Sequence, residues 1–333
     1  MWAFSRWLQK TWYSPYPVWF FIPLAWVFWL LAALRRVAYR LGILRTAALP
    51  VPVVVVGNIS VGGTGKTPFV IWLANELRGR GFKPGIVTRG YGAAMGDPRL
   101  VPAGSGVDEA GDEALLLARH GGVPVAAGHD RVAAARLLLA FGVDVILSDD
   151  GLQHYRLPRV HEIALVDGAR GLGNGWLLPA GPLRESEHRL ETMHQVVIKE
   201  TPGGAFTWPD AVRMRLSVDT AVSLRDGSRA VLNSFSGRKV HAVAGIGHPR
   251  QFFATLEAAG LMVDSRELPD HARLETADLA FDDTAPVFMT EKDAVKCTGL
   301  GLTNHWYVEA AASFDAPGAA RVVQAIVDKL RTR

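Results

Sequence analysis

The stretch from Val53 to Pro68, VVVVGNISVGGTGKTP, constrains the fold more than any other part of the chain. Four consecutive valines are typical of a strand that is buried on both faces. The glycines that follow allow the backbone to curl around phosphate oxygens without Cβ clashes. Lys66 and Thr67 come next, and Pro68 is tolerated where a helix begins, because the first amides of a helix lack partners. This order of elements predicts a phosphate-binding P-loop.

The loop departs from the usual P-loop pattern at one position. Ser60 stands where the pattern has its first glycine, and the extra pair Gly62-Gly63 resembles the GGxGKT loops of some P-loop ATPases. The alternative is a glycine-rich turn without a ligand, which the valine strand and the Gly-Lys-Thr string disfavour. We therefore expect ATP and Mg²⁺ as cofactors, with Lys66 on the outer phosphates and the Thr67 hydroxyl on the metal. The expected nucleotide-binding residues are Ser60, Val61, Gly62, Gly63, Thr64, Gly65, Lys66 and Thr67.

The distribution of charge indicates a basic N-terminal arm on an otherwise acidic chain. The 333 residues carry a formal net charge of +4. The segment before Glu76 has no acidic residue and carries +7, so the remainder carries −3. This arrangement favours contact with an anionic membrane surface, and we expect no nucleic-acid partner. The single cysteine, Cys297, excludes a disulfide framework within one chain and fits a reducing compartment.

The arm also contains the most apolar run of the chain. Val18 to Leu34 is an uncharged run of 17 residues interrupted by Pro23, which is the short limit for crossing a bilayer. Six of the ten tryptophans lie at or before Trp29, and four arginines follow the run between Arg35 and Arg45. Indole rings prefer the headgroup level of a membrane. We expect a membrane-anchoring helix that either spans once or lies in the interface. A cleaved signal peptide and a buried core helix are the alternatives.

Apolar strands alternate with helices through the rest of the chain. This pattern predicts an α/β fold of the P-loop NTPase type, a mostly parallel sheet with helices on both faces. A second, smaller α/β domain begins near Val240. We expect an arm over residues 1–49, a P-loop domain over 50–200, a β linker over 201–235 and a C-terminal α/β domain over 236–333. Strands are expected at 53–56, 83–88, 123–127, 143–147, 162–166, 195–199, 212–218, 221–224, 240–244 and 286–289, and helices at 69–80, 112–120, 129–141, 251–259 and 319–330.

Ligands of such sheets bind beyond the carboxyl ends of the strands. Asp149 and Asp150 end a buried strand downstream of the P-loop, where P-loop enzymes place a carboxylate for Mg²⁺. The alternative is a turn in which aspartate caps local amides. Asp112 is either a carboxylate in the first turn of a helix or a base that takes a hydroxyl proton. The pair Arg184-Glu185 and His271 are, taken alone, more typical of a solvated helix start and a structural loop histidine.

Several strings along most of the chain resemble one family, the tetraacyldisaccharide 4′-kinase (lipid A 4′-kinase) of Gram-negative bacteria. The Asp-Asp-Gly-x-Gln-His and Thr-Glu-Lys-Asp-x-Val-Lys strings are specific when they occur with this P-loop, and Ser60 is itself a feature of that family. The matching segments are Gly57 to Pro68, Thr88 to Gly92, Gly111 to Glu113, Asp149 to His154, Gly181 to Glu185, Ala244 to Gly247, Pro269 to His271 and Thr290 to Lys296.

The resemblance implies a lipid kinase that transfers the γ-phosphate of ATP to the 4′-hydroxyl of tetraacyldisaccharide 1-phosphate in lipid A biosynthesis. It also implies two α/β domains with the active site in the cleft, and contact with the cytoplasmic face of the inner membrane. The catalytic dyad of the family matches Asp112 and His271, with Lys66 as a further catalytic residue. Thr67, Asp149 and Asp150 are the implied metal ligands. The implied substrate residues are Arg89, Tyr91, Arg184 and Glu185.

A second hypothesis comes from the GGTGKT loop alone. The same loop resembles membrane-associated P-loop ATPases that act as conformational switches for a protein partner. A switch of this kind hydrolyses ATP without a small acceptor, and it does not require Asp112, His271 or the Arg184-Glu185 pair in a cleft.

Overall fold

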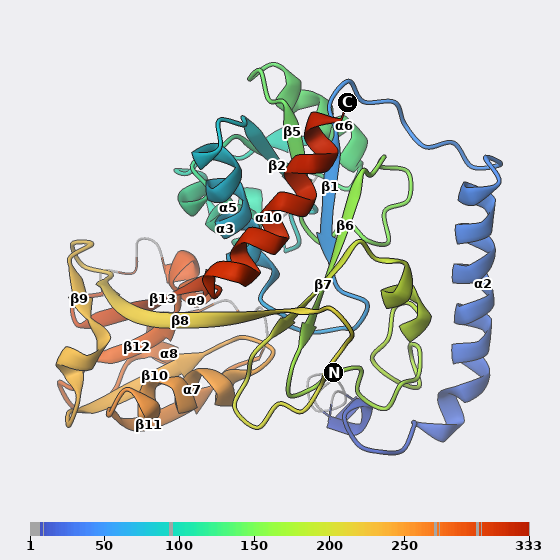
Figure 1. Ribbon diagram of the computed structural model, residues 1–333. Coiled ribbons are helices and arrows are strands. Elements are labelled where there is room, and N and C mark those ends of the chain that lie inside the picture. The colour runs from blue at the N-terminus through green and yellow to red at the C-terminus, as the bar shows by residue number, and fades with distance from the viewer. Residues whose placement is uncertain are drawn as a thin grey trace.

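The computed structural model describes residues 7–8, 10–92, 96–269, 272, 274–297, 300 and 302–332. Within these residues, thirteen strands form one continuous sheet (Figure 1). The order is β11-β10-β12-β13-β8-β7-β6-β1-β5-β2-β4-β3, and β9 pairs with β8 beside this path. The P-loop half contains β1 (Val53–Gly57), β2 (Pro84–Thr88), β3 (Arg99–Leu100), β4 (Val125–Ala127), β5 (Val145–Ser148), β6 (His161–Asp167) and β7 (Gln195–Lys199).

The P-loop half is parallel except at its edge, where β3 runs antiparallel to β4. Helices cover both faces, as expected. Successive side chains of a strand point to opposite faces, so Val54 and Val56 of β1 pack in one core and Val53 and Val55 in another. The first core includes residues of α3 (Lys66–Gly79) and α5 (Asp112–His120), and the second includes α6 (Arg131–Leu139). The short helix α4 (Val107–Ala110) precedes α5, and the 3-10 turn η2 (Glu187–Thr192) precedes β7.

The smaller half of the sheet is built on β8 (Val212–Ser223), which joins the two halves. Its first residues pair in parallel with β7, and its later residues pair antiparallel with β13 (His305–Ser313). The sequence predicts two short strands here, over 212–218 and 221–224. The structure has one strand, because Thr220 pairs with Glu309 of β13 and the ladder continues past a shift in register between Glu309 and Ala311. The other elements are β9 (Arg229–Val231), η3 (Leu232–Phe235), β10 (Lys239–Ala244), α7 (Pro249–Ala258), β11 (Met262–Glu267), α8 (Thr276–Leu279), β12 (Val287–Thr290), α9 (Glu291–Ala294) and η4 (Val295–Cys297).

The last helix, α10 (Ala316–Arg331), returns from the smaller half to the P-loop half (Figure 1). Its buried side chains Val322, Val323, Ile326 and Val327 belong to the same core as β1 and α3. The sequence places this helix in a C-terminal domain over 236–333, so the packing of α10 crosses the predicted boundary. The division of the chain into domains stays a prediction.

The N-terminal helix stands at one edge of the molecule (Figure 1). It consists of η1 (Trp19–Phe21) and α2 (Ile22–Arg40), and Ala25 is the one buried residue of α2. Within the described residues, the stretch Trp19–Arg40 is the one helix long and apolar enough to cross a membrane, with a mean hydropathy of 1.6. Its contacts with the body include a hydrogen bond from Arg35 to the Gln153 carbonyl and the packing of Tyr39 on Tyr155.

Candidate active site at the carboxyl edge of the sheet

The P-loop lies between β1 and α3, and its glycines adopt backbone angles that favour glycine. Gly62 has φ +122° and Gly65, which caps α3, has φ +81°. A Cβ atom at Gly65 would lie 3.0 Å from the Met214 methyl group and 3.4 Å from the Lys199 side chain. The helix begins at Lys66, three residues earlier than the sequence predicts, so Pro68 lies inside its first turn. The loop therefore has the backbone form that the GGxGKT string predicts.

Lys66 points toward the turn that follows β5. Its Nζ lies 3.5 Å from Oδ1 of Asp150, and Nη1 of Arg184 lies 3.1 Å from both carboxylate oxygens of Asp150. Burial disfavours the ionised form of Asp150, but the charges of Lys66, Arg184 and Arg131 outweigh it and lower the pKa of this carboxyl. Asp150 also has φ +48°, an uncommon value for a residue other than glycine. The structure thus brings Lys66, Asp150 and Arg184 together.

Asp149 has different surroundings from Asp150. Its Oδ2 accepts a hydrogen bond of 3.1 Å from the Thr88 hydroxyl at the end of β2. Burial and the nearby charge of Glu113 raise the pKa of Asp149 to about 6, and Lys66 opposes this shift. Behind the turn, the buried guanidinium of Arg131 donates to the Ser148 hydroxyl and the Asp149 carbonyl. Arg131 therefore supports the backbone that positions both aspartates.

The donor set at this edge suits a magnesium nucleotide. Oδ1 of Asp149 and the Thr64 hydroxyl are buried and have no hydrogen-bond partner among the described residues. Mg²⁺ prefers hard oxygen ligands, and it leaves room for substrate phosphates around one or two carboxylates. Thr67, in the first turn of α3 after β1, offers a hydroxyl, and Asp149 and Asp150 offer carboxylates just after β5, the strand beside β1. These residues fit the metal and the nucleotide that the P-loop implies.

Asp112 begins α5 and is 3% exposed. Its Oδ1 accepts the Glu113 amide at 2.9 Å, and Nζ of Lys292 lies 3.8 Å from Oδ2. Gly111 before it has φ +82°, and a Cβ there would meet the Tyr91 carbonyl oxygen at 2.3 Å. The start of α5 therefore packs directly on the loop after β2. His271, the expected partner of Asp112, lies outside the described residues.

The loop after β2 carries the other two expected substrate residues. Arg89 directly follows Thr88 and is exposed, and the Tyr91 side chain is 53% exposed. Both lie at the carboxyl edge of the sheet with the P-loop and the Asp149-Asp150 turn, because β2 is parallel to β5. Their side chains are thus accessible at the edge where the sequence places the substrate.

Glu185 differs from the other expected substrate residues because it is buried among protein partners. Oε1 accepts a hydrogen bond of 2.9 Å from the Gln153 amide, Oε2 accepts one from the Tyr155 hydroxyl, and Nε of Arg189 lies 3.4 Å away. Burial and the charge of Glu185 raise the pKa of Tyr155 to about 12. The carboxylate therefore links the loop after the Asp149-Asp150 turn to the segment that carries Arg184.

Sequence reasoning missed Lys292 as a site residue. It belongs to α9 in the smaller half, and its Nζ lies 3.2 Å from Oε1 of Glu113 on α5. The adjacent Asp293 is fully buried: it accepts from the Gly245 amide at 3.1 Å and from the Thr290 hydroxyl at 2.7 Å. The Thr-Glu-Lys-Asp string contains both residues, but sequence alone does not show which part of the first half Lys292 faces.

A second missed pair is the buried ion pair of Lys199 and Asp167, whose atoms Nζ and Oδ2 are 2.6 Å apart. The two residues end β7 and β6, so the rule about carboxyl ends of parallel strands would have found them.

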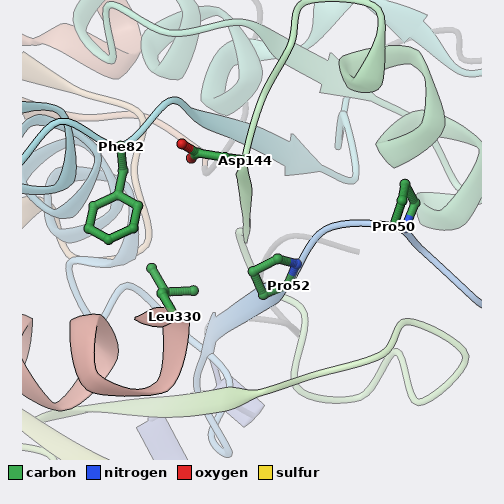
Figure 2. Close-up of a pocket in the computed structure, with 5 residues that line it drawn as sticks. All are labelled: Pro50, Pro52, Phe82, Asp144 and Leu330. Atoms are coloured by element: carbon green, nitrogen blue, oxygen red, sulfur yellow. The ribbon is translucent and has the colours of Figure 1, made fainter. Parts of the chain in front are cut away.

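The cavity in Figure 2 lies at the opposite edge of the sheet. Pro52, Asp144 and Phe82 precede β1, β5 and β2, so these lining residues stand at the amino ends of the strands. Pro50 and Leu330 complete the lining of the cavity, whose volume is about 280 Å³. The cavity is separate from the P-loop and carries none of the expected site residues.

Comparison with known proteins identifies the family. The family model described as tetraacyldisaccharide-1-P 4′-kinase matches residues 17–329. Tetraacyldisaccharide 4′-kinase of Alkalilimnicola ehrlichii is 52% identical over 86% of each chain, and that of Nitrosococcus oceani is 46% identical over 96% of this chain and 94% of the other. A crystal structure of LpxK from Aquifex aeolicus in complex with ATP superposes with a TM-score of 0.77 and 27% identity, covering 93% of this chain and 98% of that one. The chain therefore belongs to the tetraacyldisaccharide-1-P 4′-kinase family.

Proposed function

We propose that this protein is an ATP-dependent lipid kinase of lipid A biosynthesis, which transfers the γ-phosphate of ATP to the 4′-hydroxyl of tetraacyldisaccharide 1-phosphate. The observation that carries the proposal is the ion-paired cluster of Lys66, Asp150 and Arg184 at the mouth of the P-loop, in a chain of this family. The switch hypothesis is not favoured, because the family is a kinase family with a lipid acceptor.

Phosphoryl transfer depends on positioning and charge neutralisation more than on covalent chemistry. The loop amides from Ser60 to Thr67 and the Lys66 ammonium bind the phosphates. Thr67, Asp149 and Asp150 would hold Mg²⁺, which would neutralise charge on the phosphate oxygens. Asp149 carries an unpartnered oxygen and both oxygens of Asp150 are paired, which supports Asp149 as the more direct ligand.

Asp112 acts as the base for the sugar hydroxyl, with His271 as its partner. Its place at the start of α5, packed on the loop after β2, supports this role, because a general base must lie within reach of the reacting hydroxyl. Lys292 approaches Asp112 from the smaller half of the sheet. The surroundings of Asp112 therefore include a charge from the smaller half, as expected of a site between two domains. Arg89, Tyr91 and Arg184 contact the sugar or its phosphate, and Glu185 positions Arg184 through the segment it anchors.

The substrate carries acyl chains and stays in the bilayer, so the enzyme must reach the membrane. The exposed apolar face of α2 and the arginines that follow it support contact with the inner membrane from its cytoplasmic side, where ATP is available.

The test is transfer of labelled γ-phosphate from ATP to tetraacyldisaccharide 1-phosphate in detergent micelles with Mg²⁺, followed by thin-layer chromatography. We expect labelled lipid from the wild type, and a loss of at least about 100-fold in Lys66→Ala, because one charge aimed at the transition state contributes this much. Asp144→Asn, at the opposite edge of the sheet, is the matched control and should keep full activity. Release of inorganic phosphate without labelled lipid would contradict the proposal.

A further inference from the structure

The segment before α2 is fixed to the loop that faces the P-loop. Trp12 is buried, and its indole donates a hydrogen bond of 2.9 Å to the Pro179 carbonyl. The backbone N–H of Asn174 donates to the Trp12 carbonyl at 2.9 Å, and the backbone N–H of Val18 donates to the Ala180 carbonyl at 3.1 Å. Part of the arm is therefore a built component of the protein body.

The next residue, Tyr13, reaches the P-loop itself. Its hydroxyl donates a hydrogen bond of 2.9 Å to the carbonyl of Val61. The amide of Val61 is held on its other side by the Pro182 carbonyl at 2.8 Å. Because both backbone groups of Val61 are bonded in this way, the position of the loop just before Gly62 depends on an arm residue.

Arg170 completes the contact. Its guanidinium lies 3.9 Å above the centre of the Tyr13 ring, a cation–π arrangement. A Cβ atom built on Gly62 would lie 2.5 Å from Nη1 of Arg170, so the Arg170 guanidinium packs directly on the backbone of the phosphate loop. Among the described residues, Arg170 forms no salt bridge within 4.0 Å; the charge of Asp167 reaches it only from a greater distance, and Asp167 itself pairs with Lys199. A half-buried cation without such a partner favours an anion beside it.

We propose that Tyr13 and Arg170 position the phosphate loop for the triphosphate of ATP, so that the arm contributes to nucleotide affinity as well as to membrane contact. The inference rests on the proposed ATP-binding function. Tyr13 holds the Val61 carbonyl and the face of the guanidinium, and Arg170 supplies a positive charge next to Gly62. Arg170 is a positioning residue here, and its charge adds to that of Lys66 at the entrance of the loop.

The test is calorimetric titration of the full chain in detergent with Mg²⁺ and a non-hydrolysable ATP analogue. Arg170→Ala and Tyr13→Ala should each raise the dissociation constant about tenfold, a modest effect for a charge next to a phosphate. Tyr13→Phe keeps the ring and loses the hydroxyl, so a smaller increase of about threefold is expected from one lost hydrogen bond. The double variant Tyr13→Ala with Arg170→Ala should fall short of the product of the single effects, because the two side chains act through each other.

Kinetics separates this role from a general loss of structure. The variants should raise the KM for ATP and leave the KM for the lipid unchanged, and Tyr13→Phe, which keeps the ring, should also keep the melting temperature. Tyr16→Ala, with a ring that is 77% exposed three residues further along the arm, is the matched control and should bind ATP like the wild type. The inference would be overturned if Tyr13→Phe, Tyr13→Ala, Arg170→Lys and Arg170→Ala all bound ATP like the wild type. It would also be overturned if Tyr16→Ala weakened ATP binding as much as Tyr13→Ala does. A wild type that binds no ATP would instead overturn the proposed function.

Discussion

Asp149 and Asp150 are neighbours in the chain with opposite electrostatic surroundings. Asp150 faces Lys66 and Arg184, which lower its pKa against the effect of burial, whereas burial and Glu113 raise the pKa of Asp149. Two carboxylates with separated pKa values suit two tasks. Asp150 pairs with Lys66 and Arg184, whereas Asp149 keeps a buried oxygen without a hydrogen-bond partner among the described residues, as its proposed role in metal binding requires.

The proposed base can be tested by an isosteric change. Asp112→Asn keeps the shape of the side chain and can still accept the Glu113 amide, but it cannot take a proton. We expect kcat to fall by about 10²- to 10⁴-fold, the usual contribution of a general base, with ATP affinity unchanged. The measurement is phosphate transfer to the lipid at saturating ATP, with calorimetry of ATP binding alongside. A variant with normal kcat would rule out Asp112 as the base.

At this scale, sequence reasoning found residues that end buried strands and missed partners that come from distant segments. Asp149, Asp150 and Arg89 follow strands, and the structure places them at one edge as expected. Lys292 approaches Asp112 across 180 positions of chain, a separation that no local pattern reveals. The carboxylate of Glu185 bonds to Gln153 and Tyr155, contacts that sequence spacing does not show, and its role toward the substrate stays a prediction.

At the scale of elements, α9 connects the two halves through its charged residues. Asp293 holds the Gly245 amide and the Thr290 hydroxyl, and it pairs with Lys296 at 3.1 Å, so it fixes the short helix in place. Lys292 and Glu291 then face α5 of the other half, where they meet Glu113 and His120. Asp293 thus fixes α9, and Lys292 and Glu291 align the start and the end of α5 with it.

The pair of His120 and Glu291 predicts a pH-dependent stability. The hydrogen bond to Glu291 raises the pKa of His120 most, Glu309 adds to the rise, and burial and Arg119 oppose it. A raised folded-state pKa stabilises the fold fully below the ordinary histidine value and loses this contribution as the pH rises through the folded value. The melting temperature of the wild type should therefore exceed that of His120→Gln at pH 6, and the gap should close by about 1–2 °C toward pH 9.

The control for this experiment is His129→Gln, which removes an exposed histidine before α6. Thermal melts of the three proteins between pH 6 and pH 9 give the comparison. A gap between wild type and His120→Gln that stays constant over this range would show that the ion pair does not form.

Element prediction succeeded where strands are apolar and failed where they are half exposed. The six parallel strands of the P-loop half are buried throughout and were located within two residues at each end. The sequence analysis left out the short strands β3 and β9 and the longer strands β11 and β13, all of which have exposed positions. In β11 and β13, charged and small residues at these positions hide the alternation. Pairing with β10, β12 and β8 determines these strands, and this pairing is a tertiary effect.

For the whole molecule, the chain returns to the P-loop half at both ends. The helix α10 closes one core from the C-terminal side, and the segment around Trp12 and Tyr13 joins the P-loop from the N-terminal side. Sequence reasoning recognised the arm by composition and the last helix by its apolar pattern. It could not show that both pack on the first half, because the partners of α10 in this core lie about 100 to more than 200 positions away.

These two roles of the arm predict that membrane binding and ATP affinity can be separated. Trp26, Leu30 and Leu34 lie on one face of α2 and are 59%, 50% and 56% exposed. Exchange of all three for glutamine should weaken partitioning into lipid vesicles roughly 100-fold or more, since burial of each such side chain contributes about 1.5–3 kcal/mol. ATP affinity should stay at the wild-type level, because the contacts of Tyr13 are kept.

Deletion of residues 1–45 should release the protein from vesicles and also weaken ATP binding. Co-sedimentation with vesicles and calorimetry give the two readouts; loss of ATP affinity in the glutamine variant would show that α2 itself, and not Tyr13, links the arm to the P-loop.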